Sequence, residues 1–236
     1  MKVALIGYGK MGKAIEEILL ERRHEVVAKL NHTPTSEEIN GAEVAIEFTQ
    51  PDVAVDNIKE LLYMGIPVVS GTTGWLDRYG EVADLVKQQD GSFLTASNFS
   101  LGVNLFFEVT AHLAQLMNPY RDQYQIEIEE VHHTQKLDAP SGTAISIAET
   151  IINHSQYENW SLDKRSEGTI PVTAKRIDQV PGTHTVEYVS DVDTISITHT
   201  AHSRKGFALG AVIAAEWIKD KKGIFSMKDV LGLTQK

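Results

Sequence analysis

The sequence contains no cysteine, which excludes disulfides, thiolate metal sites and thiol nucleophiles. It also lacks a run of the roughly 18 apolar residues that a membrane-spanning helix needs. The first residues, Met1-Lys-Val-Ala-Leu-Ile-Gly, have no basic segment followed by a long apolar core, so we expect no signal peptide. Together these absences predict a cytoplasmic protein.

Basic residues are also in deficit, because 22 Lys and Arg face 32 Asp and Glu, for a formal net charge of −10. An acidic chain is poorly suited to sequence-independent nucleic-acid binding. It also repels an anionic substrate at long range, so an anionic ligand would need a local cluster of cations and backbone N–H groups. With 236 residues, the chain is long enough for one large or two modest domains.

The beginning of the chain combines an apolar strand, a glycine turn and a helix. Val3–Ile6 is a short apolar run, and residues 13–22 have helical periodicity. In this context the glycine spacing is the dinucleotide-binding fingerprint, and the helix N-terminus offers N–H groups to phosphate. A plain strand-to-helix turn that merely contains glycine is the alternative. The residues predicted to bind cofactor here are Gly7, Tyr8, Gly9, Lys10, Met11 and Gly12.

The end of the second predicted strand, residues 25–30, bears on the choice of cofactor. An acidic residue there would bind the ribose 2′-OH of NAD, but this sequence has Asn31 followed by His32. A neutral Asn does not repel a 2′-phosphate, and Lys10, Lys29 and His32 could attract one. We therefore predict NADH, NADPH or both as cofactor, with Asn31 and His32 among the binding residues. Alternatively, Asn31 simply bonds the ribose of either cofactor.

Strands and helices continue to alternate, which predicts a parallel sheet with right-handed crossovers. The expected strands cover 43–48, 67–70 and 92–96, with helices over 53–64 and 76–89. Ligands bind such sheets at the carboxyl ends of the strands, although each of these ends could be an ordinary turn. Further candidates to line the cofactor are Phe48, Thr49, Gly71, Thr72, Thr73, Ala96, Ser97, Asn98 and Phe99.

The order of elements changes after a helix predicted over 102–117. Strand patterns follow at 126–131, 168–175, 185–189 and 194–200, and no helix separates the last three, which indicates an α+β domain with a mixed, largely antiparallel sheet. Helices predicted at 206–217 and 224–231 then return to the first domain. We thus expect an α/β protein with two domains. They are a Rossmann-type, doubly wound dinucleotide-binding domain over residues 1–102 and 207–236, and an α+β domain over residues 103–206.

The chemistry of the second domain is concentrated between residues 127 and 144. An alternating strand enters this segment, and an apolar helix leaves it after Ser141 or Thr143, either of which can cap the helix. The loop between them is polar and carries two histidines and a lysine. Loops held by rigid elements often carry binding and catalytic groups.

This segment resembles a known signature. Glu130-Val-His-His-Thr-Gln-Lys-Leu-Asp-Ala-Pro-Ser-Gly-Thr-Ala144 is similar to the His-His-x-x-Lys-x-Asp-Ala-Pro-Ser-Gly-Thr-Ala run of the 4-hydroxy-tetrahydrodipicolinate reductase, or dihydrodipicolinate reductase, family. Further matches come in the order of that family, so the resemblance covers nearly the whole chain. They are Gly7–Gly12, Phe48-Thr49, Gly71–Gly74, Ala96–Ser100 and Pro181–Thr185.

The resemblance implies that a cyclic, unsaturated dicarboxylate is reduced by hydride from NADH or NADPH in lysine and diaminopimelate biosynthesis. It gives His132 the position of the catalytic acid/base and Lys136 that of a second proton donor. It also implies a homotetramer assembled through the sheet of the C-terminal domain, so residues 103–206 would bind substrate and mediate oligomerisation. The residues that it aligns with substrate contacts are His133, Ser141, Gly142 and Thr143.

Elementary chemistry agrees with these roles. Hydride addition leaves negative charge that a proton must quench, and histidine titrates in a suitable range to supply it. A dicarboxylate needs cations despite the acidic chain, and Arg176 is a further candidate to supply one, beside the two histidines and Lys136. The helix that begins near Ser141 adds amide donors.

The sequence departs from the family in the glycine turn, where Lys10 replaces an arginine and loses a bidentate grip on phosphate. The neutral Asn31 puts strict NAD preference in doubt. Thr183 replaces a glutamate, and we assign it no role.

Other interpretations of the same residues are possible. His132 and His133 would point to opposite sides of an extended strand, so we predict no metal site. Ser141 follows Pro140, and no Gly-x-Ser-x-Gly elbow surrounds it, so capping explains it better than a hydrolase nucleophile does.

The acidic residues Glu127, Glu129 and Glu130 are interpreted as a solvated strand face or as salt-bridge partners, and His184 as a sheet or surface residue. The alternative function is a nucleotide-binding sensor without turnover, which would leave His132 and Lys136 unexplained.

Overall fold

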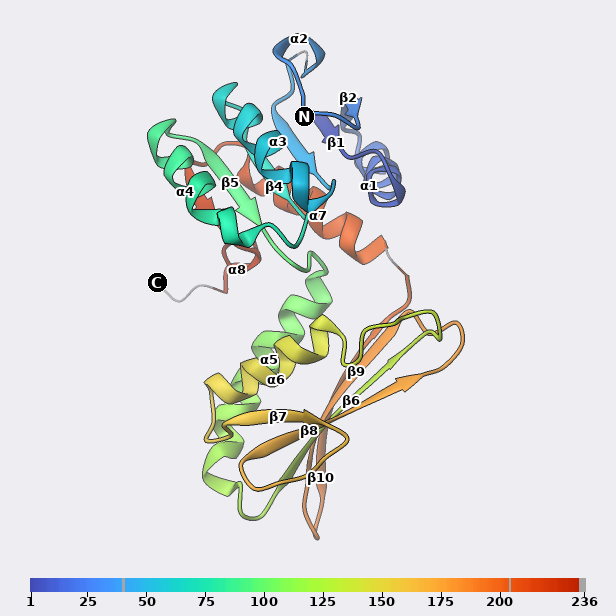
Figure 1. Cartoon of the computed structure of the whole chain (residues 1–236). Helices are drawn as coiled ribbons and strands as arrows, with labels where there is room; N and C mark the ends of the chain where they lie inside the picture. The colour runs from blue at the N-terminus through green and yellow to red at the C-terminus, as the bar shows by residue number, and fades with distance from the viewer. Residues whose placement is uncertain (40, 204, 234–236) are drawn as a thin grey trace. The chain divides into compact units, whose positions relative to one another are not determined.

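The computed structural model describes residues 1–39, 41–203 and 205–233. The chain forms two compact units (Figure 1). The first unit comprises Met1–Leu101 and Lys205–Lys236, and the second unit comprises Gly102–Arg204. The domain limits expected from the sequence lie within two residues of these bounds. The first unit is therefore built from both ends of the sequence.

Six strands form the sheet of the first unit: β1 (Lys2–Ile6), β2 (Glu25–Leu30), β3 (Val44–Glu47), β4 (Val68–Ser70), β5 (Ser92–Thr95) and β11 (Gly223–Phe225). Their order is β11-β5-β4-β3-β1-β2, and every neighbouring pair is parallel. The strands are short and almost continuously apolar, as is typical of parallel strands covered on both faces. The predicted parallel sheet is confirmed. The strand order reverses between β1 and β3, which is where such sheets bind ligands.

Helices cover both faces of this sheet (Figure 1). One face carries α1 (Lys10–Glu21) and α7 (Lys205–Ile218), and the other carries α3 (Pro51–Tyr63) and α4 (Tyr79–Gln88). The short elements are α2 (Ser36–Ile39), η1 (Leu76–Arg78) and α8 (Met227–Val230). The chain thus buries the sheet between two apolar layers.

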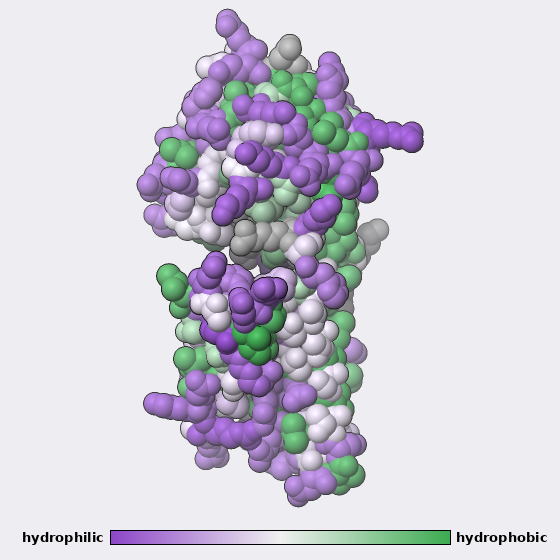
Figure 2. Space-filling model, turned by 90° about the vertical axis from the view of Figure 1, so that its right-hand side faces the viewer, coloured by the Kyte–Doolittle hydropathy of each residue, from purple (hydrophilic) through white to green (hydrophobic). Residues whose placement is uncertain are grey.

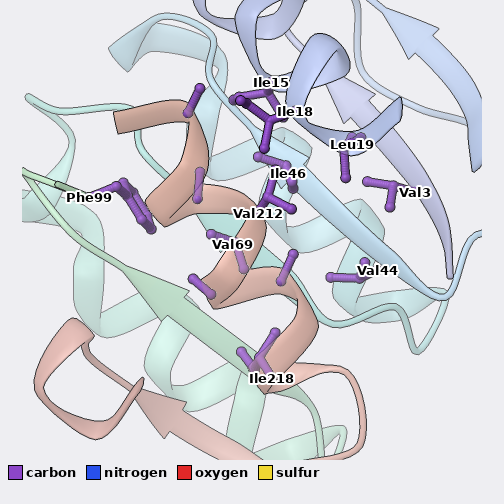
Figure 3. Packing of buried hydrophobic residues seen from close by; sticks show 14 of the residues in the cluster. Val3, Ile15, Ile18, Leu19, Val44, Ile46, Val69, Phe99, Val212 and Ile218 are labelled. Atoms are coloured by element: carbon purple, nitrogen blue, oxygen red, sulfur yellow. The ribbon is translucent and has the colours of Figure 1, made fainter. Parts of the chain in front are cut away.

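The helix α7 is the centre of one of these layers. Its Val212 and Ile218 lie in the same apolar cluster as Ile46 and Val69 of the strands and Ile15 of α1 (Figure 3). Most of its buried residues are alanine or glycine, so its backbone can approach its neighbours closely. The approach is closest at Gly210, where an added Cβ would lie 1.7 Å from the carbonyl oxygen of Phe99.

The second unit has a five-stranded sheet made of β6 (Gln125–His132), β7 (Asn159–Leu162), β8 (Thr169–Arg176), β9 (Gly182–Val189) and β10 (Thr194–Ala201). The order is β10-β9-β6-β8-β7. The pairs β6–β8 and β7–β8 are parallel, whereas β6–β9 and β9–β10 are antiparallel. The sheet is mixed as expected, but its described pairs are equally divided between the two kinds.

Two helices, α5 (Leu101–Met117) and α6 (Gly142–Asn153), pack on this sheet, and the turn η2 (Asn118–Tyr120) follows α5. Ile147 of α6 shares an apolar cluster with Ile128, Ile170 and Val186 of three different strands. The cluster holds the start of α6 near the carboxyl end of β6.

Some elements differ from the prediction. Ile224 and Phe225 were expected in a helix but belong to β11, because they pair with Phe93 and Leu94 of β5. Pairing with a buried strand outweighs their local helical periodicity. The edge strand β7 and the single-turn α2 were not predicted, since both are short and neither has the apolar run that marks the equally short strands of the first unit.

The surface shown in Figure 2 is mostly hydrophilic, with smaller hydrophobic areas between the polar side chains. No helix in the described ranges combines the length and the apolar character that a membrane crossing would require.

The close approach at Gly210 predicts a strong effect of Gly210→Ala on stability. The added methyl group would overlap the Phe99 carbonyl and cost about 1–3 kcal/mol through overpacking, more than the helix propensity of alanine returns. Gly206→Ala in the same helix is the matched control, because its Cβ would meet only Ser100 Oγ, at 3.7 Å. Urea unfolding would measure both variants, and equal stability of the two would contradict this account of the packing.

Candidate active site

Side chains of β6 point alternately to the two faces of the sheet, and two polar side chains lie on the face that packs into the core. Ile126, Ile128, Glu130 and His132 occupy every second position of the strand, and all four are buried. Glu130 and His132 stand at the carboxyl end of this row, where the apolar cluster stops. A buried carboxylate beside a buried imidazole is the first feature of the candidate site.

Glu130 is fully buried and joins three segments of the second unit. Its Oε1 accepts hydrogen bonds from Arg176 at 3.0 Å and from the backbone N–H of Ser141 at 3.1 Å. Burial by itself raises the pKa of the Glu130 carboxyl, but contacts with His132, Ser141 and Arg176 outweigh burial and lower it to about 2. Glu130 is therefore an anion at neutral pH.

The pairing of β6 with β8 explains the place of Arg176, because the register sets His132 directly beside Arg176. The Arg176 guanidinium also donates to the carbonyl oxygens of Lys136, at 3.2 Å, and Asp138, at 2.5 Å. Arg176 thus ties the loop after β6 to Glu130, and most of its donor capacity is used inside the protein.

His132 faces Glu130 through one ring nitrogen. Its Nδ1 lies 3.1 Å from Glu130 Oε2. Neither atom has a well-aligned hydrogen-bond partner among the described residues, so this contact is chiefly electrostatic. A Cβ added at Gly182 would lie 2.9 Å from His132 Nε2. The glycine therefore leaves room beside the nitrogen that does not face Glu130.

His184 of β9 completes the buried group. Its ring centroid lies 5.1 Å from that of His132, and its Nε2 lies 3.2 Å from Ser141 Oγ. Burial, together with the neighbouring charge of His132, lowers the pKa of His184 to about 4. His184 is consequently neutral at pH 7.

The loop after β6 carries the remaining predicted residues. Lys136 Nζ forms an ion pair with Asp138 at 2.8 Å, and no described hydrogen bond or ion pair joins Lys136 to His132. His133 follows β6 and is half-buried. The two predicted catalytic side chains thus lie on the same short segment, but each has its own carboxylate partner.

Ser141 caps α6, as one of the two predicted possibilities stated. Its Oγ accepts a hydrogen bond from the N–H of Ala144 at 3.2 Å. The first helical hydrogen bond runs from Ile145 to the Ser141 carbonyl, so the N–H groups of Gly142 and Thr143 precede the helical ladder. These two amides are the donors that the helix start offers to an anion.

A metal ion was not predicted, yet Glu130, His132 and His184 place ligand-type atoms within 4.8 Å of one another. A cation there would meet the guanidinium of Arg176, which already binds the same carboxylate. The Nε2 atom of His184 is also within hydrogen-bond distance of Ser141. Both contacts oppose the use of these side chains as metal ligands.

In the first unit, the glycine turn has the shape that a dinucleotide requires. Gly7 has φ +92°, and a Cβ on Gly12 would lie 2.3 Å from the Gly7 carbonyl oxygen. A Cβ on Gly9, by contrast, would meet nothing within 4 Å. Gly9 is also the N-cap of α1 and offers no side-chain cap. The first amides of α1 therefore lie beside an open glycine, as a pyrophosphate needs.

Phe48 connects the glycine turn to the other predicted segments of the first unit. Its carbonyl oxygen would be 1.9 Å from a Cβ on Gly7, and its ring would be 2.1 Å from a Cβ on Gly71. The ring centroid also lies 5.7 Å from that of Phe99. The segments that follow β1, β3, β4 and β5 are thus in mutual contact at one edge of the sheet.

The residues around Asn31 are already paired. Asn31 Oδ1 accepts the Tyr8 N–H at 2.7 Å. Lys29 forms an ion pair with Glu16, and His32 forms one with Glu38 at 2.8 Å. Two of the three cations that could attract a 2′-phosphate thus have carboxylate partners, whereas no ion pair of Lys10 occurs in the described part of the chain.

Comparison with known proteins agrees with both halves of this geometry. Residues 1–99 match the family model for the N-terminus of dihydrodipicolinate reductase, and residues 102–231 match the model for its C-terminus. The chain belongs to the dihydrodipicolinate reductase family. A curated relative from Christiangramia forsetii, named 4-hydroxy-tetrahydrodipicolinate reductase, is 54% identical over 234 residues, which are 98% of each chain.

More distant members of the dihydrodipicolinate reductase family are also similar. A 4-hydroxy-tetrahydrodipicolinate reductase of Neisseria meningitidis serogroup C is 34% identical over 204 residues, covering 83% of this chain and 74% of that protein. A dipicolinate-bound dihydrodipicolinate reductase from Paenisporosarcina sp. TG-14 has a TM-score of 0.77 at 23% identity, covering 96% of this chain and 97% of that one. At 23% identity, this structural similarity is evidence for the fold alone.

The sequence analysis did not assign Glu130 or His184 to this site. Glu127 and Glu129 pair with Arg165 and Lys175, as salt-bridge partners would. Glu130 also forms a salt bridge, but its complete burial contradicts a solvated face. The signal was present, since an alternation of two places Glu130 in one row with Ile126 and Ile128.

The lowered pKa of His184 predicts acid sensitivity. The unfolded chain, with a histidine pKa near 6.5, binds more protons than the folded chain between about pH 6.5 and 4. Stability should therefore fall as pH falls through this window, by an amount on the order of 3 kcal/mol. Glu130, whose folded pKa is about 2, contributes stability above its unfolded pKa that is lost progressively as pH falls below about 4.5.

Urea unfolding at pH 7, 5.5 and 4.5 would measure this dependence. His184→Gln, which keeps a polar side chain but cannot titrate, should have a shallower pH dependence than the unsubstituted chain. The same substitution at the exposed His112 of α5 is the control. An equally steep dependence in His184→Gln would show that His184 is not the responsible group.

Proposed function

We propose that this chain is a 4-hydroxy-tetrahydrodipicolinate reductase, which reduces a cyclic dihydrodipicolinate-type dicarboxylate to tetrahydrodipicolinate with NADH or NADPH, in the diaminopimelate route to lysine. The observation that carries the proposal is the buried Glu130, which joins His132 to the amide-rich start of α6. It puts a proton donor and an anion-binding helix start in one site. Membership of the dihydrodipicolinate reductase family supports the same reaction.

The first unit binds the nicotinamide cofactor, which supplies the hydride when bound. The open Gly9 and the first amides of α1 would hold its pyrophosphate, and Asn31 would face its ribose. The segments Phe48–Thr49, Gly71–Thr73 and Ala96–Phe99 would line the rest of its site.

The second unit binds the substrate and provides the proton. Because Glu130 faces Nδ1 of His132, the ring presents Nε2 toward the space beside Gly182. We assign the acid/base role to this nitrogen. Lys136, held by Asp138, is the second donor.

The substrate carboxylates need positive partners in an acidic protein. The amides of Gly142 and Thr143 and the side chains of His133 and Lys136 are the groups we assign to them. Arg176 was expected to bind substrate directly. Its contacts with Glu130 and with two loop carbonyls support a structural role, in which it fixes the loop that carries Lys136.

A nucleotide-binding sensor without turnover is the less favoured reading. Such a protein needs no proton donor, and it would not require a buried carboxylate to orient His132. The relatives from Christiangramia forsetii and Neisseria meningitidis are both named as reductases.

We further propose a cytoplasmic homotetramer assembled through the sheet of the second unit. The helices of this unit pack on the sheet, while the edge strand β10 is largely exposed. Thr198 of β10 hydrogen-bonds to Thr185 of β9, on the face of the sheet opposite the buried Val186. An exposed edge strand is a ready surface for another copy of the chain.

Oxidation of NADH and NADPH by the purified protein tests the function, with the product of the preceding synthase generated in place. Oxidation should require that substrate. His132→Gln and Lys136→Ala should each lower kcat by about 10²–10⁴-fold, the usual range for a general acid, while cofactor affinity stays unchanged. The controls are His112→Gln and Lys87→Ala, both on exposed helix positions. Substrate-dependent turnover that survives both site substitutions would refute these roles.

The surroundings of Asn31 predict the effect of Asn31→Asp on cofactor choice. The new carboxylate can still accept the Tyr8 N–H but repels a 2′-phosphate. We expect kcat/KM for NADPH to fall at least about tenfold relative to NADH, since one such repulsion exceeds roughly 1.4 kcal/mol. Asn159→Asp, at an exposed position of β7, controls for net charge. An unchanged ratio would place Asn31 away from the 2′ position.

A further inference from the structure

Glu47 is a buried acid for which the reaction described above has no use. It is the last residue of β3 in the first unit and is fully buried. Glutamate is rarely buried to this extent without a charged partner. In the described ranges, no Lys, Arg or His forms an ion pair with it.

Hydroxyl and amide groups replace the missing cation. Glu47 Oε2 accepts the hydroxyl of Ser70 at 2.6 Å, and Oε1 accepts the hydroxyl of Thr72 at 2.8 Å. Oε1 also accepts both the N–H of Thr49, at 3.0 Å, and its hydroxyl. Both oxygens are thus satisfied from two neighbouring strand ends, β3 and β4.

These partners belong to the segments predicted to line the cofactor. Thr49 and Thr72 are candidate cofactor residues, and the Thr49 N–H also reaches Thr72 Oγ1 at 2.8 Å. Phe48, between Glu47 and Thr49, has its carbonyl oxygen against Gly7 and its ring against Gly71. The Glu47 carboxyl therefore joins two of these segments, and the adjacent Phe48 contacts the glycine turn.

The protonation of this group is governed by its surroundings. Burial raises the pKa of the Glu47 carboxyl, and the hydrogen bonds from Ser70, Thr49 and Thr72 oppose that rise. The carboxyl is fully buried, and its hydrogen bonds join it to the ends of both β3 and β4.

We propose that Glu47 is a positioning residue for the cofactor site, which holds Phe48–Thr49 and Gly71–Thr72 in the arrangement that NADH or NADPH requires without itself touching the cofactor. This inference rests on the proposed function for the identity of the cofactor. It adds a residue of the first unit, remote in sequence from the glycine turn, to those that set cofactor affinity.

The test compares Glu47→Gln with Glu60→Gln, the same substitution on the exposed side of α3. NADH and NADPH dissociation constants are measured by fluorescence titration, with thermal melting and substrate KM on the same samples. Glu47→Gln replaces one acceptor oxygen by an NH₂ donor that faces hydroxyl groups. It should weaken the binding of both cofactors about tenfold, as expected when a buried hydroxyl group loses its acceptor, with substrate KM within about twofold.

Cofactor affinity equal to that of the unsubstituted protein would overturn the proposal. So would a loss of cofactor and substrate binding in proportion to the unfolded fraction, since that describes a merely structural residue. Ser70→Ala is the second variant, for the case in which Glu47→Gln fails to fold. It removes one hydrogen-bond donor to Glu47 and should weaken the binding of both cofactors about threefold, which is roughly half the free-energy change of the first substitution. Unchanged affinity in this variant would also overturn the proposal.

Failure of the proposed function would look different. The unsubstituted protein would then bind NADH without oxidising it in the presence of the substrate. The comparison of dissociation constants would still decide the role of Glu47.

Discussion

Glu130 has no access to water, so the protein itself must supply donors for its carboxylate. Arg176 and Ser141 donate hydrogen bonds to it, and His132 faces it at ion-pair distance. These three residues come from β8, from the start of α6 and from β6 itself. The register of the sheet, the entry of the helix and the orientation of the imidazole therefore depend on one buried charge. Breaking one of these contacts would leave the charge uncompensated, which is why the group acts as a unit.

In the first unit, a buried carboxyl group has its hydrogen-bond donors supplied without a cation. Glu47 is equally buried, but hydroxyl and amide groups from neighbouring strand ends surround it. Such donors do not add positive charge next to the segments proposed to bind cofactor. In both units a buried carboxylate fixes loops that follow parallel strands, and the exposed residues of those loops are left to contact ligands.

Local patterns in the sequence were enough to predict the parallel sheet, most helices, the glycine turn Gly7–Gly12 and the start of α6 near Ser141, because periodicity and glycine spacing are local properties. Glu130 was missed although the alternation of its own strand already placed it in the buried row. His184 was missed because it reaches Glu130 only through strand pairing, which joins residues 130 and 184 directly. The strand β11 was missed for the same reason, since its partner β5 lies far away in the sequence. The roles of the site residues remain predictions.

The discontinuity of the first unit has a consequence during synthesis. Its sheet closes with β11, and α7 completes one of its apolar layers, yet both follow the entire second unit in the chain. A nascent chain can therefore complete the continuous second unit while one face of the first unit's sheet is still only partly covered, by α1. Domains generally fold as units when their last segment has emerged. The first unit can then bind cofactor only after the second unit has been synthesised, although the glycine turn of the first unit is made first.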